Sequence, residues 1–306
     1  MRPAWSVILL TTLLGAGQGL FLALFATDLI DALRGSGALS PVFAAAAVLV
    51  SLALAGAGLA ASFFHLGHPE RAWRSAAKWR TSWLSREVIA LPLFMALGAA
   101  YGVMRWLGMP QGALAAGALA AAACFALFVC TGMIYACLKF LQEWASPLTV
   151  VNFGLLGCAS GLTAAAALAS WLEPALARPY AVAALTATLL AMAMRAGALV
   201  RNRRLRPRST LQTAIGVKHP AITQKAQGAM GGSFNTREFF HGREPRLLRL
   251  VRAGFLAGAF AAPLALLAAG WYGAAFGVQF AGLLAERWYF FAEARHPQNL
   301  YYQAIA

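Results

Sequence analysis

The sequence predicts an all-α integral membrane protein, a bundle of eight transmembrane helices with both termini in the cytoplasm. The 306 residues are 60% hydrophobic and only 11% charged, and their mean hydropathy is +0.65, whereas soluble chains carry about 25% charged residues. Long windows without charge recur along the chain. The 25 Lys and Arg residues lie almost entirely outside these windows. The net charge of +15 therefore describes connecting loops, and we expect no binding to nucleic acid.

The charge-free windows define the predicted helices. A hydrocarbon core of about 30 Å requires about 20 helical residues, because backbone polar groups must be paired in lipid. The first window is long for a signal peptide and precedes further spans, so we interpret it as a retained helix. A single helix over the last two windows would be about 60 Å long, twice the hydrocarbon thickness, so we predict two. The predicted spans are 5–27, 41–64, 87–105, 113–138, 148–171, 179–199, 250–270 and 272–292.

The distribution of basic residues predicts orientation, because cytoplasmic loops retain Lys and Arg during insertion. Of the 25 basic residues, Arg34, Arg105 and Arg178 fall on one side, and the remaining 22 fall on the side of both termini. The second side is therefore expected to be cytoplasmic. We interpret residues 1–306 as one membrane domain with a cytoplasmic interfacial loop at 65–86. A long basic loop at 200–249 suits partner docking, and attraction to anionic lipid is its alternative explanation.

Several motifs are excluded as cofactor sites. Gly15-x-Gly-x-Gly19 resembles a dinucleotide fingerprint but has no accompanying strand, so close helix packing explains it better. The four cysteines form no Cys-x-x-Cys pair, and we expect neither a metal nor an iron–sulfur site on this chain. All five histidines fall at or beyond the predicted cytoplasmic boundary. A haem b needs ligands inside the bundle, so we expect no haem.

Ionisable residues near the cytoplasmic boundary are the candidate functional groups. His65 ends the second predicted span and Glu87 begins the third, so a hairpin places them at similar depth. Both can exchange protons with a quinone, although interfacial residues that merely end helices would look the same. The tryptophan-rich, basic segment between them fits either an interfacial belt or an amphipathic lid over a quinone pocket. Glu286 and Arg287 lie in the last predicted span, and Glu293 directly follows it.

Four stretches resemble the anchor subunit family of dimethyl sulfoxide reductase. They are Phe64-His-Leu-Gly-His-Pro-Glu-Arg-Ala-Trp73, Leu84-Ser-Arg-Glu87, Met133-Ile-Tyr-Ala136 and Pro147-Leu-Thr-Val-Val-Asn152. The stretches 231–243 and 285–296 are similar to the branch that contains the membrane subunit of cytoplasmic sulfite dehydrogenase. The resemblance extends over nearly the whole chain.

This resemblance implies an anchor without haem in the bacterial inner membrane. The anchor would pass electrons between quinone, either ubiquinone or menaquinone, and a ferredoxin-like iron–sulfur subunit that serves a molybdopterin catalytic subunit on the cytoplasmic side. The quinone-site histidine and glutamate of the family correspond to the expected catalytic residues His65 and Glu87. The full set expected to bind the quinone is His65, Trp83, Arg86, Glu87, Glu286 and Arg287. The alternatives are a quinol-oxidising dimethyl sulfoxide reductase anchor, a secondary transporter and a purely structural anchor.

Overall fold

The computed structural model describes residues 3–35, 39–64, 66–206, 208–223, 225 and 245–297. All regular structure in these ranges is helical, which confirms the all-α prediction. In chain order the elements are α1 (Trp5–Arg34), α2 (Pro41–Phe63), η1 (Pro69–Lys78), α3 (Trp83–Trp106), α4 (Pro110–Ala136), α5 (Pro147–Leu172), α6 (Pro174–Arg203), α7 (Leu211–Ile215), α9 (Pro245–Leu256), the π-helical η2 (Ala257–Ala261), α10 (Ala262–Ala268) and α11 (Tyr272–Glu293).

The helix boundaries follow local sequence signals. α2, α4, α5 and α6 begin at Pro41, Pro110, Pro147 and Pro174, because proline at the first helical position loses no hydrogen bond. Helices α1 and α6 run past the predicted ends of their spans into terminal arginines. The charge-free windows missed these turns because they stopped before Asp28 in α1 and before Arg201 in α6. Asp28 is buried and paired with Arg105, and the long arginine side chains at the end of α6 reach water without ending the helix.

Seven described helices or continuous helical runs are long and apolar enough to cross a membrane: α1 to α6 and the stretch Arg246–Ala268 formed by α9, η2 and α10. α11 has 22 residues but carries Gln279, Glu286 and Arg287, and it is not among the seven. The last two helices are separate, as predicted. Gly270 has a φ of +81° and allows the tight reversal between α10 and α11.

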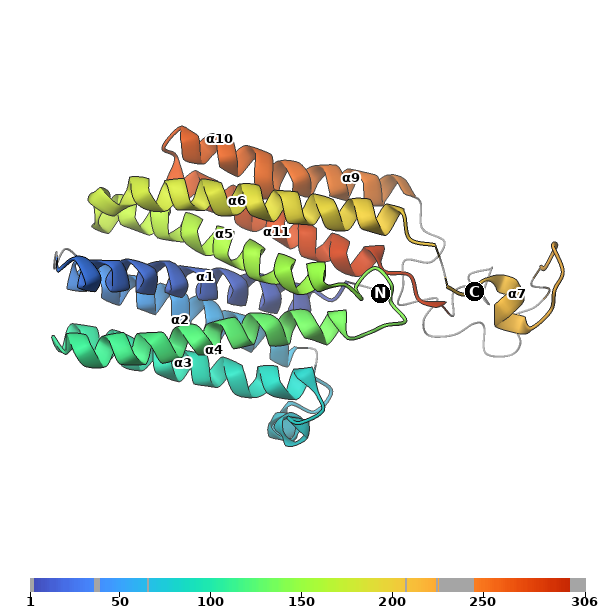
Figure 1. Cartoon of the computed structure of the whole chain (residues 1–306), viewed down its shortest axis with the longest axis horizontal. Helices are drawn as coiled ribbons and strands as arrows, with labels where there is room; N and C mark the ends of the chain where they lie inside the picture. Colours follow the sequence, from blue (N-terminus) through green and yellow to red (C-terminus); the bar gives the residue numbers. More distant parts are fainter. Residues whose placement is uncertain are drawn as a thin grey trace.

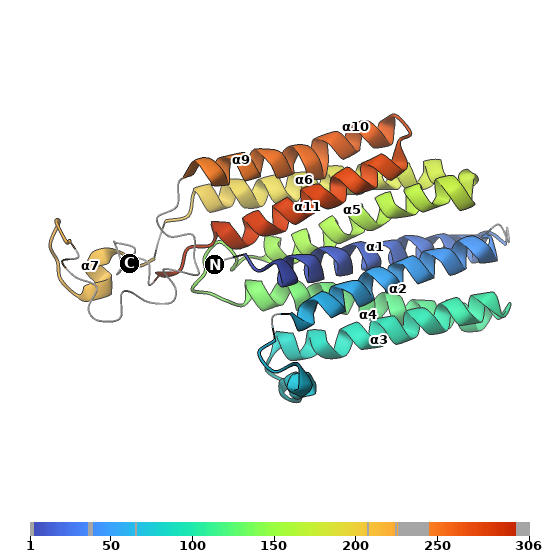
Figure 2. The ribbon, with the colours of Figure 1, turned by 180° about the vertical axis from the view of Figure 1, so that it is seen from behind.

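The helices lie side by side along one axis, with α1 near the middle of the bundle (Figures 1 and 2). α1 packs against α2, α4, α5 and α11. Of its most apolar window, 72% is buried, against 28–56% in the other six candidate spans. A Cβ at Gly19 would overlap the carbonyl oxygen of Gly157, and one at Gly161 would overlap the backbone of Gly19. The interpretation of the α1 glycines as packing residues is therefore confirmed.

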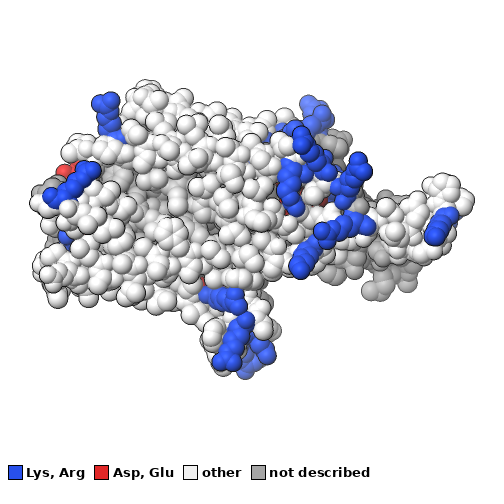
Figure 3. Space-filling view, viewed as in Figure 1, with Lys and Arg blue, Asp and Glu red and all other residues white. Residues whose placement is uncertain are grey.

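The two ends of the bundle differ in charge. α1 begins and α11 ends at the same end, which we call the basic end because Lys and Arg side chains gather there (Figures 1 and 3). At the opposite end, Arg105 Nη1 lies 3.3 Å from Asp28 Oδ1, and the Tyr101 hydroxyl donates to Asp28 Oδ2 at 3.0 Å. Asp28 is buried. This contact fastens α3 to α1 at the opposite end.

Candidate functional site

Glu87 lies in the second turn of α3 at the basic end. Ser82 caps the helix by accepting a hydrogen bond from the backbone N–H of Ser85 at 3.3 Å. Glu87 is followed on the same helical face by Leu91 and Phe94, and all three side chains are buried. The Glu87 carboxyl is thus the polar end of the face of α3 that packs into the bundle.

The partner of Glu87 is a hydroxyl group. Thr131 Oγ1 of α4 donates to Glu87 Oε1 at 2.5 Å. Glu87 is 7% exposed, and no ion pair joins it to any cation among the described residues. A buried carboxyl held by one neutral donor keeps a second oxygen available for another proton donor or acceptor. His65, its expected companion, lies outside the described residues.

Arg86 reaches back to the segment that precedes α3, and Trp83 packs against its guanidinium group. The guanidinium group of Arg86 lies 4.2 Å from the ring centroid of Trp83. Arg86 Nε donates to the carbonyl oxygen of Trp79, and Arg86 Nη2 donates to that of Arg80, both at 2.9 Å. Arg86 therefore fixes the end of the connecting segment onto the start of α3, and Trp83 packs against the Arg86 guanidinium group.

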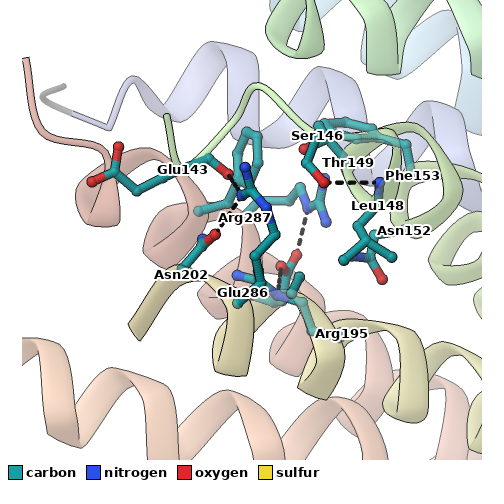
Figure 4. Close-up of a pocket in the computed structure, with 13 residues that line it drawn as sticks. Glu143, Ser146, Leu148, Thr149, Asn152, Phe153, Arg195, Asn202, Glu286 and Arg287 are labelled. Atoms are coloured by element: carbon teal, nitrogen blue, oxygen red, sulfur yellow. Dashed lines mark hydrogen bonds and ion pairs between the residues drawn. The ribbon is translucent and has the colours of Figure 1, made fainter. Parts of the chain in front are cut away.

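Glu286 and Arg287 form a buried ionic cluster with Arg195 of α6 (Figure 4). Arg195 Nε lies 2.7 Å from Glu286 Oε1, and Arg287 Nε lies 2.5 Å from Glu286 Oε2. The exposed fractions of Arg195, Glu286 and Arg287 are 3%, 0% and 4%. Each oxygen of the carboxylate therefore lies within ion-pair distance of a guanidinium group. The cluster contains two cations and one anion.

This cluster is the middle rung of a polar ladder between α6 and α11. Gln279 Nε2 donates to Thr188 Oγ1 at 3.1 Å, and Asn202 Nδ2 donates to Glu293 Oε2 at 3.3 Å. The rungs are Thr188 with Gln279, Arg195 with Glu286 and Asn202 with Glu293. Successive rungs are seven residues apart on both helices, and the ladder extends over about 21 Å.

Two small cavities flank the ladder. Their volumes are about 10 Å³ and 20 Å³, and both are lined by Phe153 and Arg287. Each has the size of one or two water molecules, which is too small for a quinone ring. Asn152 Oδ1 and Arg287 Nη1 have no hydrogen-bond partner among the described residues, and both residues line the first cavity. The polar lining suits bound water.

The structure divides the predicted site residues between two places. Glu87, Arg86 and Trp83 belong to α3, whereas Glu286 and Arg287 belong to the cluster on α11. Tyr135 of α4 lies one helical turn after Thr131, the donor to Glu87, and its ring packs against Phe290 and Phe291 of α11 with centroids 5.4 Å apart in both contacts. Its ring stacks on Phe153, with centroids 5.5 Å apart, in an aromatic cluster at the basic end.

Sequence reasoning missed Arg195 and Tyr135. Arg195 falls inside the predicted span 179–199, and its seven-residue spacing from Thr188 and Asn202 is the signal that could have revealed it. Tyr135 lies in Met133-Ile-Tyr-Ala136, one of the stretches that resemble the family. That stretch served only to identify the resemblance, and its tyrosine was not considered as a site residue.

The family model described as "DMSO reductase anchor subunit (DmsC)" matches residues 1–220. The sulfite dehydrogenase subunit designated C, from Allochromatium vinosum, is 55% identical to this chain over an alignment that covers 100% of each protein. No solved structure matches the chain. The family match covers Glu87 and Arg195 and ends before α9, so the ladder joins the matched region to the C-terminal helices.

Proposed function

Because the chain belongs to the DMSO reductase anchor subunit family, we propose that it is the quinone-reactive membrane subunit of a sulfite-oxidising molybdopterin complex. The full-length similarity to a sulfite dehydrogenase subunit supports sulfite as the substrate of the complex. In this proposal a ferredoxin-like iron–sulfur subunit exchanges electrons with the anchor, and the sulfur chemistry takes place on a molybdopterin subunit. The anchor itself holds no haem.

The complex assembles on the cytoplasmic face of the bacterial inner membrane. The basic end is the cytoplasmic end in this proposal, since cytoplasmic loops retain positive charge. α11 crosses the membrane as the eighth helix, because it packs against α1 and α5 and its charged residues are covered by α6. Both termini and the connection between α6 and α9 then face the partner subunits.

The proposed quinone site rests on the buried Glu87 carboxyl and its hydrogen bond from Thr131. Ubiquinone or menaquinone, when bound, supplies a couple that exchanges two electrons and two protons. The donor set at the basic end fits such a group, because it offers a carboxyl that can exchange a proton and a hydroxyl that orients it. Glu286 is ion-paired with two guanidinium groups, whereas the Glu87 carboxyl has no ion pair among the described residues and accepts a hydrogen bond from Thr131.

The remaining predicted residues have distinct roles in this proposal. His65 exchanges protons together with Glu87 at the end of α2. Arg86 and Trp83 position the first turns of α3 through their contacts with each other and with the preceding segment. The cluster of Glu286 and Arg287 supplies positive charge near the site without exchanging protons itself.

The test is quinone-dependent sulfite oxidation in membranes that carry the whole complex. Glu87→Gln removes the exchangeable proton but keeps the hydrogen bond from Thr131, so we expect a rate loss of about 100-fold or more. His65→Ala should also lower the rate. Glu70→Gln is the matched control, because Glu70 is an exposed carboxylate in the same connection, and Glu87→Asp should restore part of the activity. Unchanged rates for Glu87→Gln in a fully assembled complex would refute the assigned role.

A further inference from the structure

The segment 66–82 between α2 and α3 has a surface unlike the rest of the bundle. Its short helix η1 packs against α3 and projects from the side of the bundle at the basic end (Figures 1 and 3). Trp73 is 71% exposed and Trp79 is 53% exposed. The cations of the segment are Arg71, Arg74, Lys78 and Arg80, all of them exposed.

The tryptophans and arginines of this segment form pairs. The guanidinium group of Arg74 lies 5.5 Å from the ring centroid of Trp73, and that of Arg80 lies 5.4 Å from the ring centroid of Trp79. Each pair presents an apolar ring together with a cation. Indole rings favour the boundary between hydrocarbon and headgroups, and arginine binds phosphate, so a pair of this kind fits the headgroup layer.

The position of the segment agrees with this chemistry. It connects the end of α2 with the start of α3, and both helices are long and apolar enough to cross the membrane. Phe64 and Leu84, which lie on either side of the segment, are largely exposed apolar residues. The segment therefore lies at the level where hydrocarbon gives way to headgroups.

The net charge of the segment indicates which type of lipid headgroup it would bind. Its one carboxylate, Glu70, is 3.1 Å from His68 Nδ1 and 3.7 Å from Arg71 Nε. The four cations against this single acid leave a net positive surface, which attracts anionic lipid. We propose that η1 and its flanking residues are a binding site for anionic phospholipid headgroups, with the Trp73 and Trp79 rings inserted at the headgroup level.

This surface is separate from the end where other basic residues gather. Figure 3 shows its cations on the flank of the bundle, apart from those that follow α6. Arg86 holds the segment in place through the carbonyl groups of Trp79 and Arg80. The lipid site is thus built on a fixed support at the start of α3, and it is independent of the proposed quinone chemistry.

The test measures how much phosphatidylglycerol stays bound to the full-length chain. The purified protein is transferred from mixed micelles of phosphatidylcholine and phosphatidylglycerol, and retained lipid is counted by native mass spectrometry. One variant changes Arg71, Arg74, Lys78 and Arg80 to glutamine. The matched control changes the four arginines that end and follow α6, namely Arg203, Arg204, Arg206 and Arg208, to glutamine.

We expect retention of phosphatidylglycerol to fall in the η1 variant, by about fivefold in affinity for each cation removed, and to change little in the control. Equal losses in both variants would overturn the proposal, because they would show attraction to net charge alone. Normal retention of phosphatidylglycerol in the η1 variant would also overturn it.

A second variant keeps the proposal testable if loss of four cations impairs folding. Trp73 and Trp79 are changed to serine, and Trp171 and Trp271, both exposed near the opposite end, are changed to serine in the control. In vesicles that contain brominated phosphatidylglycerol, the η1 variant should lose the quenchable fluorescence of two headgroup tryptophans. The same quenching in this variant and in the unmodified chain would contradict the proposal.

Discussion

Removing the carboxylate of the buried cluster tests its charge balance most directly. Glu286→Gln would leave the guanidinium groups of Arg195 and Arg287 in the bundle without the carboxylate that contacts both of them. Breaking a buried ion pair from one side costs about 3–5 kcal/mol, because the remaining charge stays desolvated. Two cations would remain here, so we expect a loss near the upper end of that range in the free energy of unfolding.

The same reasoning predicts a smaller effect from the other side of the cluster. Arg195→Met removes one cation, keeps most of the apolar stem and leaves Glu286 paired with Arg287, so the expected loss is at most about 2 kcal/mol. The assay is unfolding of the purified chain in mixed micelles by increasing SDS, followed by loss of helicity. Glu70→Gln is the exposed control, expected within about 0.5 kcal/mol of the unmodified chain. A loss for Arg195→Met as large as that for Glu286→Gln would refute the charge-balance argument.

Three further predictions use the same unfolding assay. Gly161→Ala should destabilise the chain by about 1–3 kcal/mol because its Cβ would overlap α1, whereas Gly154→Ala on the same helix meets open space and should be neutral or slightly stabilising; equal effects would contradict the packing argument. Asp28→Ala should cost about 1–3 kcal/mol, since the buried Tyr101 hydroxyl loses its acceptor; an unchanged stability would show that this contact contributes nothing. Burial raises the pKa of Glu143 in the connection between α4 and α5, so its contribution to stability is full below the ordinary pKa of glutamate and is lost as pH rises through the raised value. Unfolding at a series of pH values should therefore show a decline that Glu143→Gln removes, and a decline that persists in that variant would exclude Glu143 as its source.

The sequence was sufficient for the positions of the helices because charge-free windows report directly where lipid can surround a chain. All eight predicted ranges contain helix, including the two C-terminal ones separated at Gly270. The place of Glu87 at the start of a span predicted a position near one end of the bundle, and the structure puts it in the second turn of α3.

The partners of the site residues could not be predicted in the same way. A window analysis treats each helix separately, whereas the neighbour of Glu286 depends on which helix packs beside it and in which register. Arg195 lies 91 positions earlier in the chain than Glu286, with the long connection and other helical elements between them. Thr131 as the donor to Glu87 was missed for the same reason, since nothing in the α3 sequence specifies the facing turn of α4.

The equal spacing of polar residues on α6 and α11 determines where the chain tolerates insertions and deletions. Each of the three contacts joins residues that are 91 positions apart. A change in the length of the connection between α6 and α9 would change this separation equally for all three pairs, so we expect the pairing itself to be kept. A single residue inserted between Gln279 and Glu286 would instead rotate half of α11 by about 100° and separate it from its partners. Deletion scanning should therefore find a permissive connector beside a helix that accepts no change in length.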